Sequence, residues 1–412
     1  MDQIAPMPDP YAVPLEQIDF SDARMHRDDT WRDYFTRLRD EAPVHYQKDS
    51  PFGPFWSISR FEDIVAIDSN FKDFSSEPQI VLGEFPQDTE MFIAMDPPKH
   101  DVQRRAVQSV VAPKNLAQME VLIRSRVVEI MDNLPVGETF NWVEKVSINL
   151  TTQMLATLFG FPFEERTKLT YWSDLAVGTP EIMGGEACSD ERDVAMAECL
   201  EAFTRLWHER KAQDSDSFDL ISLLQRDPNT ADLVDRPKEY MGNLILLIVG
   251  GNDTTRNSLT AGVLALNEFP AEYDKLRADH GLIASMVPEI IRWQTPLSYM
   301  RRRATRDVEF GGQQIKKGDK VVMWYVSGNR DPRAIENPDD FIINRANPRH
   351  HLSFGFGIHR CMGNRLAEMQ LRIAWEEIMK RFSLVEVMGE PTRVLNNMVR
   401  GIENLPVRVH PL

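Results

Sequence analysis

The chain of 412 residues carries 47 Lys and Arg against 63 Asp and Glu, which gives a formal net charge of −16. This acidic balance argues against nucleic acid as a partner, because binding to phosphates needs a basic surface. Three cysteines are too few for a disulfide framework, no run of eighteen apolar residues predicts a membrane span, and the proline-rich N-terminus lacks the order of a signal peptide. We therefore expect a cytoplasmic protein without a membrane anchor.

The first elements in chain order are strands, and helices follow them. Strands are predicted near 44–46 and 55–59, and a helix is predicted at 60–69. From about residue 114 to residue 269 the spacing of apolar residues is mostly helical. This region ends in one long helix from about Lys238 to Glu268.

The second part of the chain returns to strands before a last helix. A β-rich segment is predicted at 306–326, and the last strong helix runs from about Met362 to Phe382. No linker, repeat or low-complexity tract divides the sequence. We expect a single domain over residues 1–412 of mainly α class, with a large helical part and a smaller β-rich part drawn mainly from about 44–60, 306–326 and the C-terminal segment.

The centre of the long helix, "GGNDTT", is unusual for a buried helix. Gly250 and Gly251 each cost about 1 kcal/mol against Ala in a helix interior, and a run of polar residues follows them at once. Taken alone, the residues fit two interpretations equally well. One is a close helix-packing contact beside a satisfied buried carboxylate, and the other is a functional break in the helix.

A glycine-rich loop that becomes a helix, "HLSFGFGIHRCMGNRLAEMQL", carries the strongest signal. Cys361 stands at the start of that helix, where free N–H groups and the helix dipole favour a thiolate over a thiol. The glycines allow a flat bulky group to approach the backbone, Phe354 can lie against its edge, and His359 can meet an acidic substituent. These features describe a thiolate ligand to haem iron.

Other readings of this loop are weaker. Taken without its flanking residues, a lone cysteine is more often a small buried hydrophobe than a ligand. A zinc site lacks partners, because the other two cysteines, Cys188 and Cys199, lie far away in the sequence and have no assignable role. A dinucleotide-binding loop would need a third glycine and a preceding strand.

The pattern F-G-x-G-x-H-x-C-x-G resembles the haem-binding loop of the cytochrome P450 superfamily, and it is filled here by Phe354, Gly355, Gly357, His359, Cys361 and Gly363. The resemblance implies the cytochrome P450 fold, with haem b between the long central helix and the cysteine loop. It also implies that Cys361 is the axial ligand of the iron.

Further segments resemble the same family in the expected order. "EIIR" and "DDFIINR" supply Glu289, Arg292 and Arg345, which match the structural ion pair of the family. His100, Arg104 and Arg302 match its haem-propionate contacts. Read singly, each of these would be an ordinary surface pair or a solvated charge.

The helix signature "GGNDTT" resembles the A/G-G-x-D-T-T motif of the family's oxygen-binding helix. The resemblance implies that Gly250 leaves room beside the haem for dioxygen and substrate, and that the helix opens locally. It also implies that Asp253 and Thr254 deliver protons during catalysis. The presence of this acid–alcohol pair favours a monooxygenase over a peroxide-using haem-thiolate enzyme or a non-enzymatic haem sensor or carrier.

The whole sequence resembles the soluble bacterial alkane and medium-chain fatty-acid terminal hydroxylases of this superfamily. That resemblance implies ω-hydroxylation of aliphatic chains, while a terpene or steroid substrate stays open. The predicted apolar pocket residues are Ile80, Val81, Leu82, Met95, Leu246, Val249, Leu297, Met300 and Met398. Electrons would come from a ferredoxin and its reductase, which would be guided by a basic patch of Arg104, Arg105, Arg360, Arg365 and Arg372.

Overall fold

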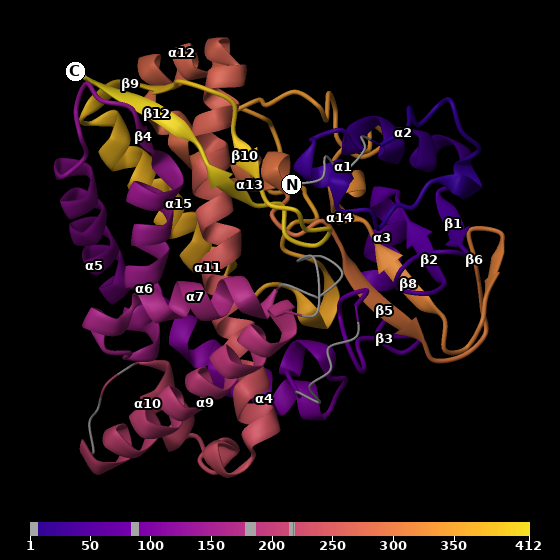
Figure 1. Ribbon diagram of the computed structural model, residues 1–412, viewed down its shortest axis with the longest axis horizontal. Coiled ribbons are helices and arrows are strands. Elements are labelled where there is room, and N and C mark those ends of the chain that lie inside the picture. The colour runs from indigo at the N-terminus through magenta and orange to yellow at the C-terminus, as the bar shows by residue number, and fades with distance from the viewer. Residues whose placement is uncertain (1–6, 84–89, 178–186, 214–216, 218) are drawn as a thin grey trace.

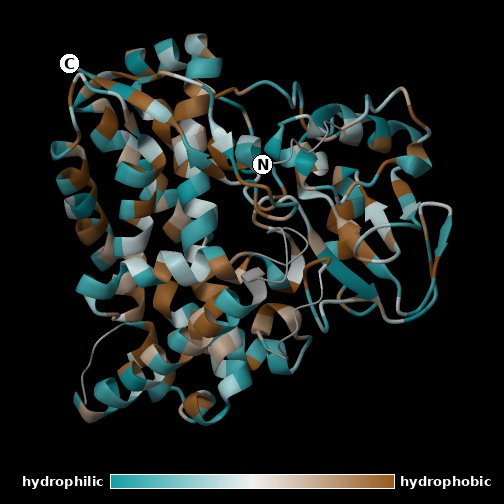
Figure 2. Ribbon diagram, viewed as in Figure 1, coloured by the Kyte–Doolittle hydropathy of each residue, from teal (hydrophilic) through white to brown (hydrophobic). Residues whose placement is uncertain are grey.

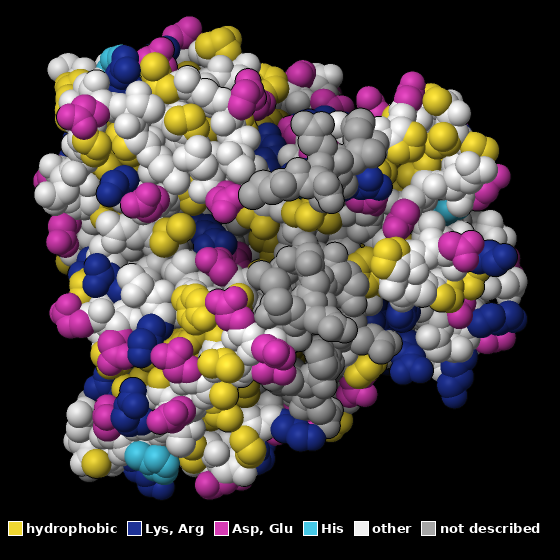
Figure 3. All heavy atoms as spheres, viewed as in Figure 1, with side chains coloured by type: hydrophobic (Ala, Val, Ile, Leu, Met, Phe, Trp, Pro, Cys, Tyr) yellow, Lys and Arg dark blue, Asp and Glu magenta, His cyan; other side chains and the backbone are white. Residues whose placement is uncertain are grey.

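The computed structural model describes residues 7–83, 90–177, 187–213, 217 and 219–412. A large helical part lies beside a smaller part that contains a five-stranded sheet (Figure 1). Most of the helices carry both apolar and polar residues, as the hydropathy colouring in Figure 2 shows. Acidic and basic side chains are interspersed over the face seen in Figure 3.

The helical part is built around one long central helix. Its helices are α4 (Lys99–Gln108), α5 (Pro113–Asp132), α6 (Asn149–Phe159), α7 (Thr167–Ala176), α9 (Ala187–Gln213), α10 (Leu220–Arg226), α11 (Pro237–Glu268), α12 (Pro270–Ala278), α13 (Ile283–Gln294) and α15 (Asn364–Met379). A π-helical turn at Val143–Ile148 leads into α6. Helix α11 begins with a proline at its first position, which suits that position because the missing N–H has no helical partner there. It then contacts α6, α7, α13 and α15, so it forms the axis of this part.

The sheet-rich part combines strands from distant segments. Its sheet has the order β1 (Val44–Gln47), β2 (Phe55–Ile58), β8 (Lys320–Met323), β5 (Met300–Ala304) and β3 (Phe74–Ser75). The β2–β8 pair is parallel and the others are antiparallel. The short helices packed nearby are α1 (Arg24–Arg27), α2 (Trp31–Glu41), α3 (Phe61–Asp68) and α14 (Tyr325–Gly328).

Smaller sheets complete the fold. They are the three-stranded sheet of β4 (Phe140–Asn141), β12 (Pro406–Pro411) and β9 (Phe382–Val387), and the pairs β6 (Val308–Phe310) with β7 (Gln313–Ile315) and β10 (Thr392–Arg393) with β11 (Ile402–Asn404). Within the residues described above, no helix is both long enough and apolar enough to cross a membrane.

The mainly α class is confirmed, and so are the first two strands and the long helix, which lie within one or two residues of their predicted bounds. Two boundaries are wrong. The end of the predicted β region is the short helix α14, and α15 stops before Phe382 because that residue begins β9. Strand β5 and the π-helical turn do not follow from the sequence pattern.

Candidate active site

The loop before α15 is fixed by backbone hydrogen bonds and by close packing. The Cys361 N–H donates to the Phe354 carbonyl at 2.7 Å. Gly355 and Gly357 both have positive φ, of 66° and 64°. A Cβ at Gly357 would lie 2.6 Å from the backbone oxygen of Asp68. Both glycines therefore admit left-handed turns, and Gly357 also admits the close contact with the end of α3. That they serve the approach of a bound group stays a prediction.

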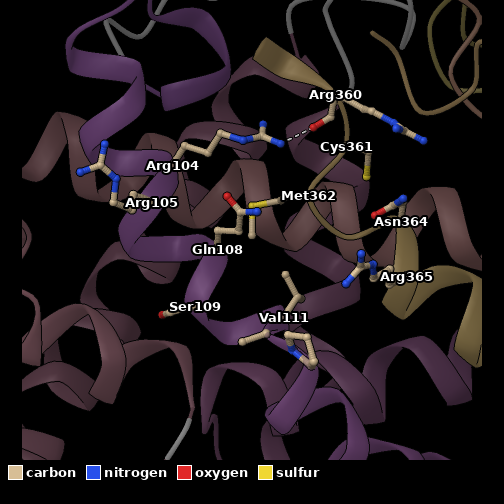
Figure 4. Close-up of a pocket in the computed structure, with 12 residues that line it drawn as sticks. Arg104, Arg105, Gln108, Ser109, Val111, Arg360, Cys361, Met362, Asn364 and Arg365 are labelled. Atoms are coloured by element: carbon tan, nitrogen blue, oxygen red, sulfur yellow. Dashed lines mark hydrogen bonds between the residues drawn. The ribbon is translucent and has the colours of Figure 1, made fainter. Parts of the chain in front are cut away.

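Cys361 opens into a pocket of about 500 Å³ between α4 and the start of α15 (Figure 4). Its side chain is exposed to this pocket instead of being packed in the core. Other pocket-lining side chains come from α4 and the segment after it, and from the cysteine loop: Arg104, Arg105, Gln108, Val111, Arg360, Met362, Asn364 and Arg365. Arg104 reaches across from α4 and donates to the carbonyl of Arg360.

Surrounding protein atoms still crowd the sulfur of Cys361, and this burial raises the pKa of the thiol. The N–H groups of Gly363 and Asn364 act in the opposite direction, and so do the charges of Arg104 and Arg360. The N–H groups at the helix start thus favour a thiolate, as expected, but burial outweighs them in the net direction of the pKa. A coordinated metal ion would deprotonate such a thiol.

Two buried histidines meet beside this loop. The rings of His100 on α4 and His359 have centroids 4.5 Å apart. The Nε2 atom of His100 and both ring nitrogens of His359 have no hydrogen-bond partner within the described structure. Burial, together with the charge of Arg302, the His100 ring and the charge of Arg104, lowers the pKa of His359 to about 2. Four groups that were predicted to meet the haem propionates thus lie near one another.

The two arginines of this group are already engaged. Arg302 on β5 donates from Nη2 to Oδ1 of Asp68 at 2.6 Å and from Nη1 to the Arg301 carbonyl at 2.9 Å. Arg104 is half-buried, and burial lowers its pKa. Each guanidinium has five N–H donors, so one or two fixed contacts leave others for an acidic group.

Helix α11 continues through the glycine pair, so the predicted local opening of the helix is wrong for this structure. The Thr254 hydroxyl donates to the Gly250 carbonyl at 2.8 Å, a contact that often bends helices slightly without breaking them. Gly250 is exposed, although it lies midway along the central helix, and a Cβ built there would meet no atom within 4 Å. Gly251 is different, since its Cβ would lie 2.8 Å from Leu155.

Asp253 lies three residues after Gly250 and is fully buried. It accepts a hydrogen bond from Ser173 Oγ at 3.1 Å, and its Oδ1 lies 2.9 Å from Arg256. Burial raises the pKa of Asp253 to about 6, although Arg256 and Ser173 act in the opposite direction. The carboxyl group therefore changes protonation near neutral pH, as a proton-transfer group should.

The predicted ion pair is brought together in the core. Glu289 and Arg292 have no exposed side-chain surface, and Glu289 contacts both Arg292 at 2.7 Å and Arg345 at 3.0 Å. Burial alone would raise the pKa of Glu289, but hydrogen bonds from the two arginines and from the Ile342 N–H outweigh it and hold the pKa below its ordinary value. Arg292 also donates to the carbonyls of Asn329 and Pro338, so this pair anchors the segments around α14.

The predicted pocket residues separate into groups. Ile80 and Val81 form a small apolar cluster against which Met300 and Met398 pack. Half-buried positions on α11 and before β5 are Leu246, Val249 and Leu297. Leu82 has no exposed surface and belongs to a core cluster with Tyr299 and Trp324, so it is not a pocket wall. Met95 lies in the main helical core.

Three residues that contact this site do not follow from the sequence pattern. Asp68 holds Arg302, and Ser173 and Arg256 hold Asp253. Arg256 could have been found, because it lies three residues after Asp253 on a helix. Asp68 and Ser173 come from distant segments and leave no local signal.

Comparison with known proteins identifies the family. A family model described as Cytochrome P450 matches residues 179–408. Linalool 8-monooxygenase of Pseudomonas putida is 32% identical over 413 residues, which cover 96% of this chain and 100% of the relative. Methyl-branched lipid omega-hydroxylase of Mycobacterium bovis is 32% identical over 97% of this chain and 96% of the relative. The solved structure of Cytochrome P450-153 from Novosphingobium aromaticivorans has a TM-score of 0.89 at 43% identity, covering 95% of this chain and 99% of that one.

The chain therefore belongs to the cytochrome P450 family. It is a monooxygenase of that family, with a haem held through a cysteine thiolate, and it uses dioxygen, an electron donor and a small-molecule substrate.

The described residues fit such a haem. Cys361 has an exposed side chain at a helix start, and the unpartnered nitrogens of His100 and His359 are suited to acidic substituents. Gly250 faces space that a side chain would fill. The Arg302 and Arg104 side chains lie close enough to these histidines to lower the pKa of His359.

Proposed function

We propose that Cys361 is the thiolate ligand of the haem and that the protein hydroxylates the terminal carbon of linear aliphatic chains, either alkanes or fatty acids. The observation that carries the ligand assignment is the exposed side chain of Cys361 at the start of α15. It follows His359 by two residues, and the buried ring nitrogens of His359 have no partner in the described structure.

The reaction inserts one oxygen atom of dioxygen into a C–H bond and reduces the other to water, with two electrons and two protons. The haem supplies oxygen activation when bound, and the thiolate favours cleavage of the O–O bond. This chain's residues supply space and protons. Gly250 leaves room at the reaction centre. The Thr254 hydroxyl donates to the Gly250 carbonyl, so its oxygen is left to accept a hydrogen bond from that space.

Asp253 is the proton source in this proposal. Its side chain is buried, but Arg256 links it to Asp174, whose side chain is 49% exposed. A carboxyl group with a pKa of about 6 releases and regains a proton readily near neutral pH. The acid–alcohol pair supports dioxygen as the oxidant, and it argues against a peroxide-using enzyme or a haem sensor.

The proposed substrate class rests on the apolar lining and on the relatives. Met300, Met398, Leu246 and Val249 offer half-buried apolar surface, which suits a ligand with few polar anchors. The resemblance to bacterial alkane and fatty-acid terminal hydroxylases and the match to a lipid omega-hydroxylase both favour attack at a chain end. The second candidate is a terpene, which the equally long match to linalool 8-monooxygenase favours.

We assign the electron supply to a ferredoxin. Arg104, Arg105, Arg360 and Arg365 line the pocket at Cys361 and form a basic patch on an acidic chain. Such a patch favours association with an acidic partner, mainly through the rate of encounter. Arg372 does not belong to it, because its guanidinium is paired with Glu120 and Glu376 at 2.7 Å each.

Two experiments test this function. Reduced protein with carbon monoxide should show the red-shifted Soret band that gives the superfamily its name, and Cys361→Ala should lose that band. Retention of the band in Cys361→Ala would contradict the ligand assignment. Alkanes, fatty acids and terpenes of increasing length are then screened for a low-to-high-spin shift, and the products are identified by mass spectrometry. Terminal alcohols support the proposal, whereas internal or terpene alcohols support the second candidate.

A further inference from the structure

Asp68 joins three segments of the site at one buried carboxylate. It is the last residue of α3, and it is 2% exposed. Its Oδ1 accepts a hydrogen bond from Arg302 Nη2 at 2.6 Å, and its Oδ2 accepts from the Tyr325 hydroxyl at 2.8 Å and from the Phe356 N–H at 2.7 Å. Strand β5, helix α14 and the cysteine loop therefore meet at this side chain.

Helix formation does not explain an acidic residue at this position. The C-terminal end of a helix carries partial negative charge, so a carboxylate there is unfavourable, and burial adds a further cost. Arg302 and two uncharged donors offset that cost. Burial and the Asp68 charge raise the pKa of Tyr325 well above its ordinary value, so its hydroxyl stays protonated and donates. Residues that break a local rule in this way are typical of functional sites.

The hydrogen bond between Asp68 and the Phe356 N–H affects the position of Cys361, because a short loop joins Phe356 to the cysteine. Gly355 and Gly357 flank Phe356, and both have the positive φ that the turn requires. The loop then returns, so that the Cys361 N–H donates to the Phe354 carbonyl. Fixing the Phe356 N–H therefore limits the positions that the backbone of Cys361 can adopt.

The contact with Arg302 has an electrostatic consequence. Asp68 holds one end of the guanidinium and places a negative charge 2.6 Å from it. Both side chains are almost fully buried, where charges interact strongly because little water screens them. An acidic group bound near His359 thus faces an arginine whose orientation is fixed and whose charge is largely balanced.

We propose that Asp68 is a positioning residue of the haem site, which holds the cysteine loop in place and sets both the orientation and the net charge of the Arg302 pair. This inference rests on the proposed function, in which Cys361 ligates the haem and Arg302 meets a propionate. The hydrogen bonds of Asp68 go to Arg302, Tyr325 and Phe356, so it acts through these partners.

The test compares three single variants of the haem-loaded protein. Asp68→Asn keeps the size of the side chain, removes its charge and places an amide where acceptors are needed. Tyr325→Phe removes one hydrogen bond to Asp68 and leaves all charges in place. Asp73→Asn is the control. Asp73 lies five residues after Asp68, and it forms an exposed ion pair with Arg306.

Two measurements are made on each variant. Hydrogen exchange followed by mass spectrometry reports the loop at 352–361, and spectroelectrochemistry reports the haem reduction potential. Asp68→Asn should speed exchange in the loop about tenfold, which corresponds to about 1.4 kcal/mol, and should shift the potential positively because the Arg302 charge is no longer balanced. Tyr325→Phe should speed exchange less and leave the potential unchanged. Asp73→Asn should change neither quantity.

The proposal would be overturned if Asp68→Asn showed the same loop hydrogen exchange as the wild type. It would also be overturned if that variant had the same reduction potential as the wild type. If Asp68→Asn does not fold, the Tyr325→Phe variant decides the proposal. Faster hydrogen exchange of the loop in Tyr325→Phe supports the proposal, and unchanged exchange overturns it. All three variants retain Cys361, so the differences between them in loop hydrogen exchange report the contacts of Asp68 and not the identity of the ligand. Failure of this inference is therefore separate from failure of the ligand assignment, which Cys361→Ala tests by the loss of the Soret band.

Discussion

The Oδ1 atom of Asp253 lies 2.9 Å from the guanidinium of Arg256, which is one turn further along α11. The same guanidinium lies 2.6 Å from Asp174 on α7, whose side chain reaches the solvent. A buried acid on the central helix is thus joined to a solvent-exposed carboxylate by one arginine. The guanidinium does not give up its protons, so Arg256 positions Asp253, and the proton of the proposed path is carried by the Asp253 carboxyl group.

Asp253→Asn should lower the rate of product formation by about 10²- to 10⁴-fold, the range for loss of a general acid–base group. Because the pKa of Asp253 is about 6, its protonated fraction falls as the pH rises through 6. The wild-type rate should therefore decline from pH 5 to pH 8, and the Asn variant should show a flat profile. Steady-state rates with saturating electron donor check this.

Asp174→Asn is the matched control for that profile. The negative charge of Asp174 helps to raise the pKa of Asp253, so its removal should move the decline to lower pH without abolishing it. If Asp253→Asn formed product at the wild-type rate, the Asp253 carboxyl group would not be part of the proton path.

Thr254→Ala should retain haem and substrate binding but direct more of the consumed electrons to hydrogen peroxide. The Thr254 hydroxyl is held at the Gly250 carbonyl, where it borders the open space at that glycine. The ratio of product to electron donor consumed measures this effect. Thr254→Ser keeps the hydroxyl and should restore most of the coupling. Full coupling in the Ala variant would contradict a role in proton delivery.

Glu289→Gln should destabilise the protein by about 3–5 kcal/mol, the usual cost of breaking a buried ion pair by removing one partner. Neither Glu289 nor Arg292 has exposed side-chain surface, so the remaining arginine charge would be buried without its partner. Urea unfolding monitored by fluorescence gives the change. Asp132→Asn, which breaks the more exposed pair with Arg381, should cost about 1 kcal/mol or less. A similar small loss in Glu289→Gln would show that the core pair contributes little.

Sequence patterns predict elements well where one rule dominates, and they miss elements where burial and charge conflict. The long helix α11 is predicted almost to its ends, because prolines border a long apolar run. Strand β5 is missed, because three consecutive arginines hide a strand in which Arg301 and Arg302 are buried. Their charges are acceptable only because distant segments, including Asp68, supply acceptors.

The residues of the candidate site can also be divided into those that a local sequence rule predicts and those that it does not. The spacing of Glu289 and Arg292 on one helix shows that they can pair, since residues three apart face each other. The position of Cys361 before a helix is also visible in the sequence. The contact between His100 and His359 joins segments more than 250 residues apart in the sequence, and no local rule predicts it.

Arg365→Glu should slow reduction by a ferredoxin, mostly at low ionic strength, because charge steering is screened by salt. Arg365 is exposed and lines the pocket at Cys361. Arg372→Glu is the comparison: it should affect reduction less but lower stability, because it breaks contacts with Glu120 and Glu376. Stopped-flow reduction at low and high salt measures both variants. Equal rates for Arg365→Glu and the wild type would exclude this patch as the docking site.

Gly250→Ala and Gly251→Ala should have opposite effects on stability although the two residues are neighbours. At Gly250 the added methyl group meets no atom within 4 Å, so the helix should gain up to about 1 kcal/mol from better propensity. At Gly251 the methyl group would lie 2.8 Å from Leu155, which must move, so that gain should be reduced or reversed. Gly250→Ala should lose more activity than Gly251→Ala, because only the methyl group at Gly250 enters the open space proposed for dioxygen and substrate. Thermal unfolding and product assays of both variants test this. Full activity in Gly250→Ala would show that the reaction takes place elsewhere.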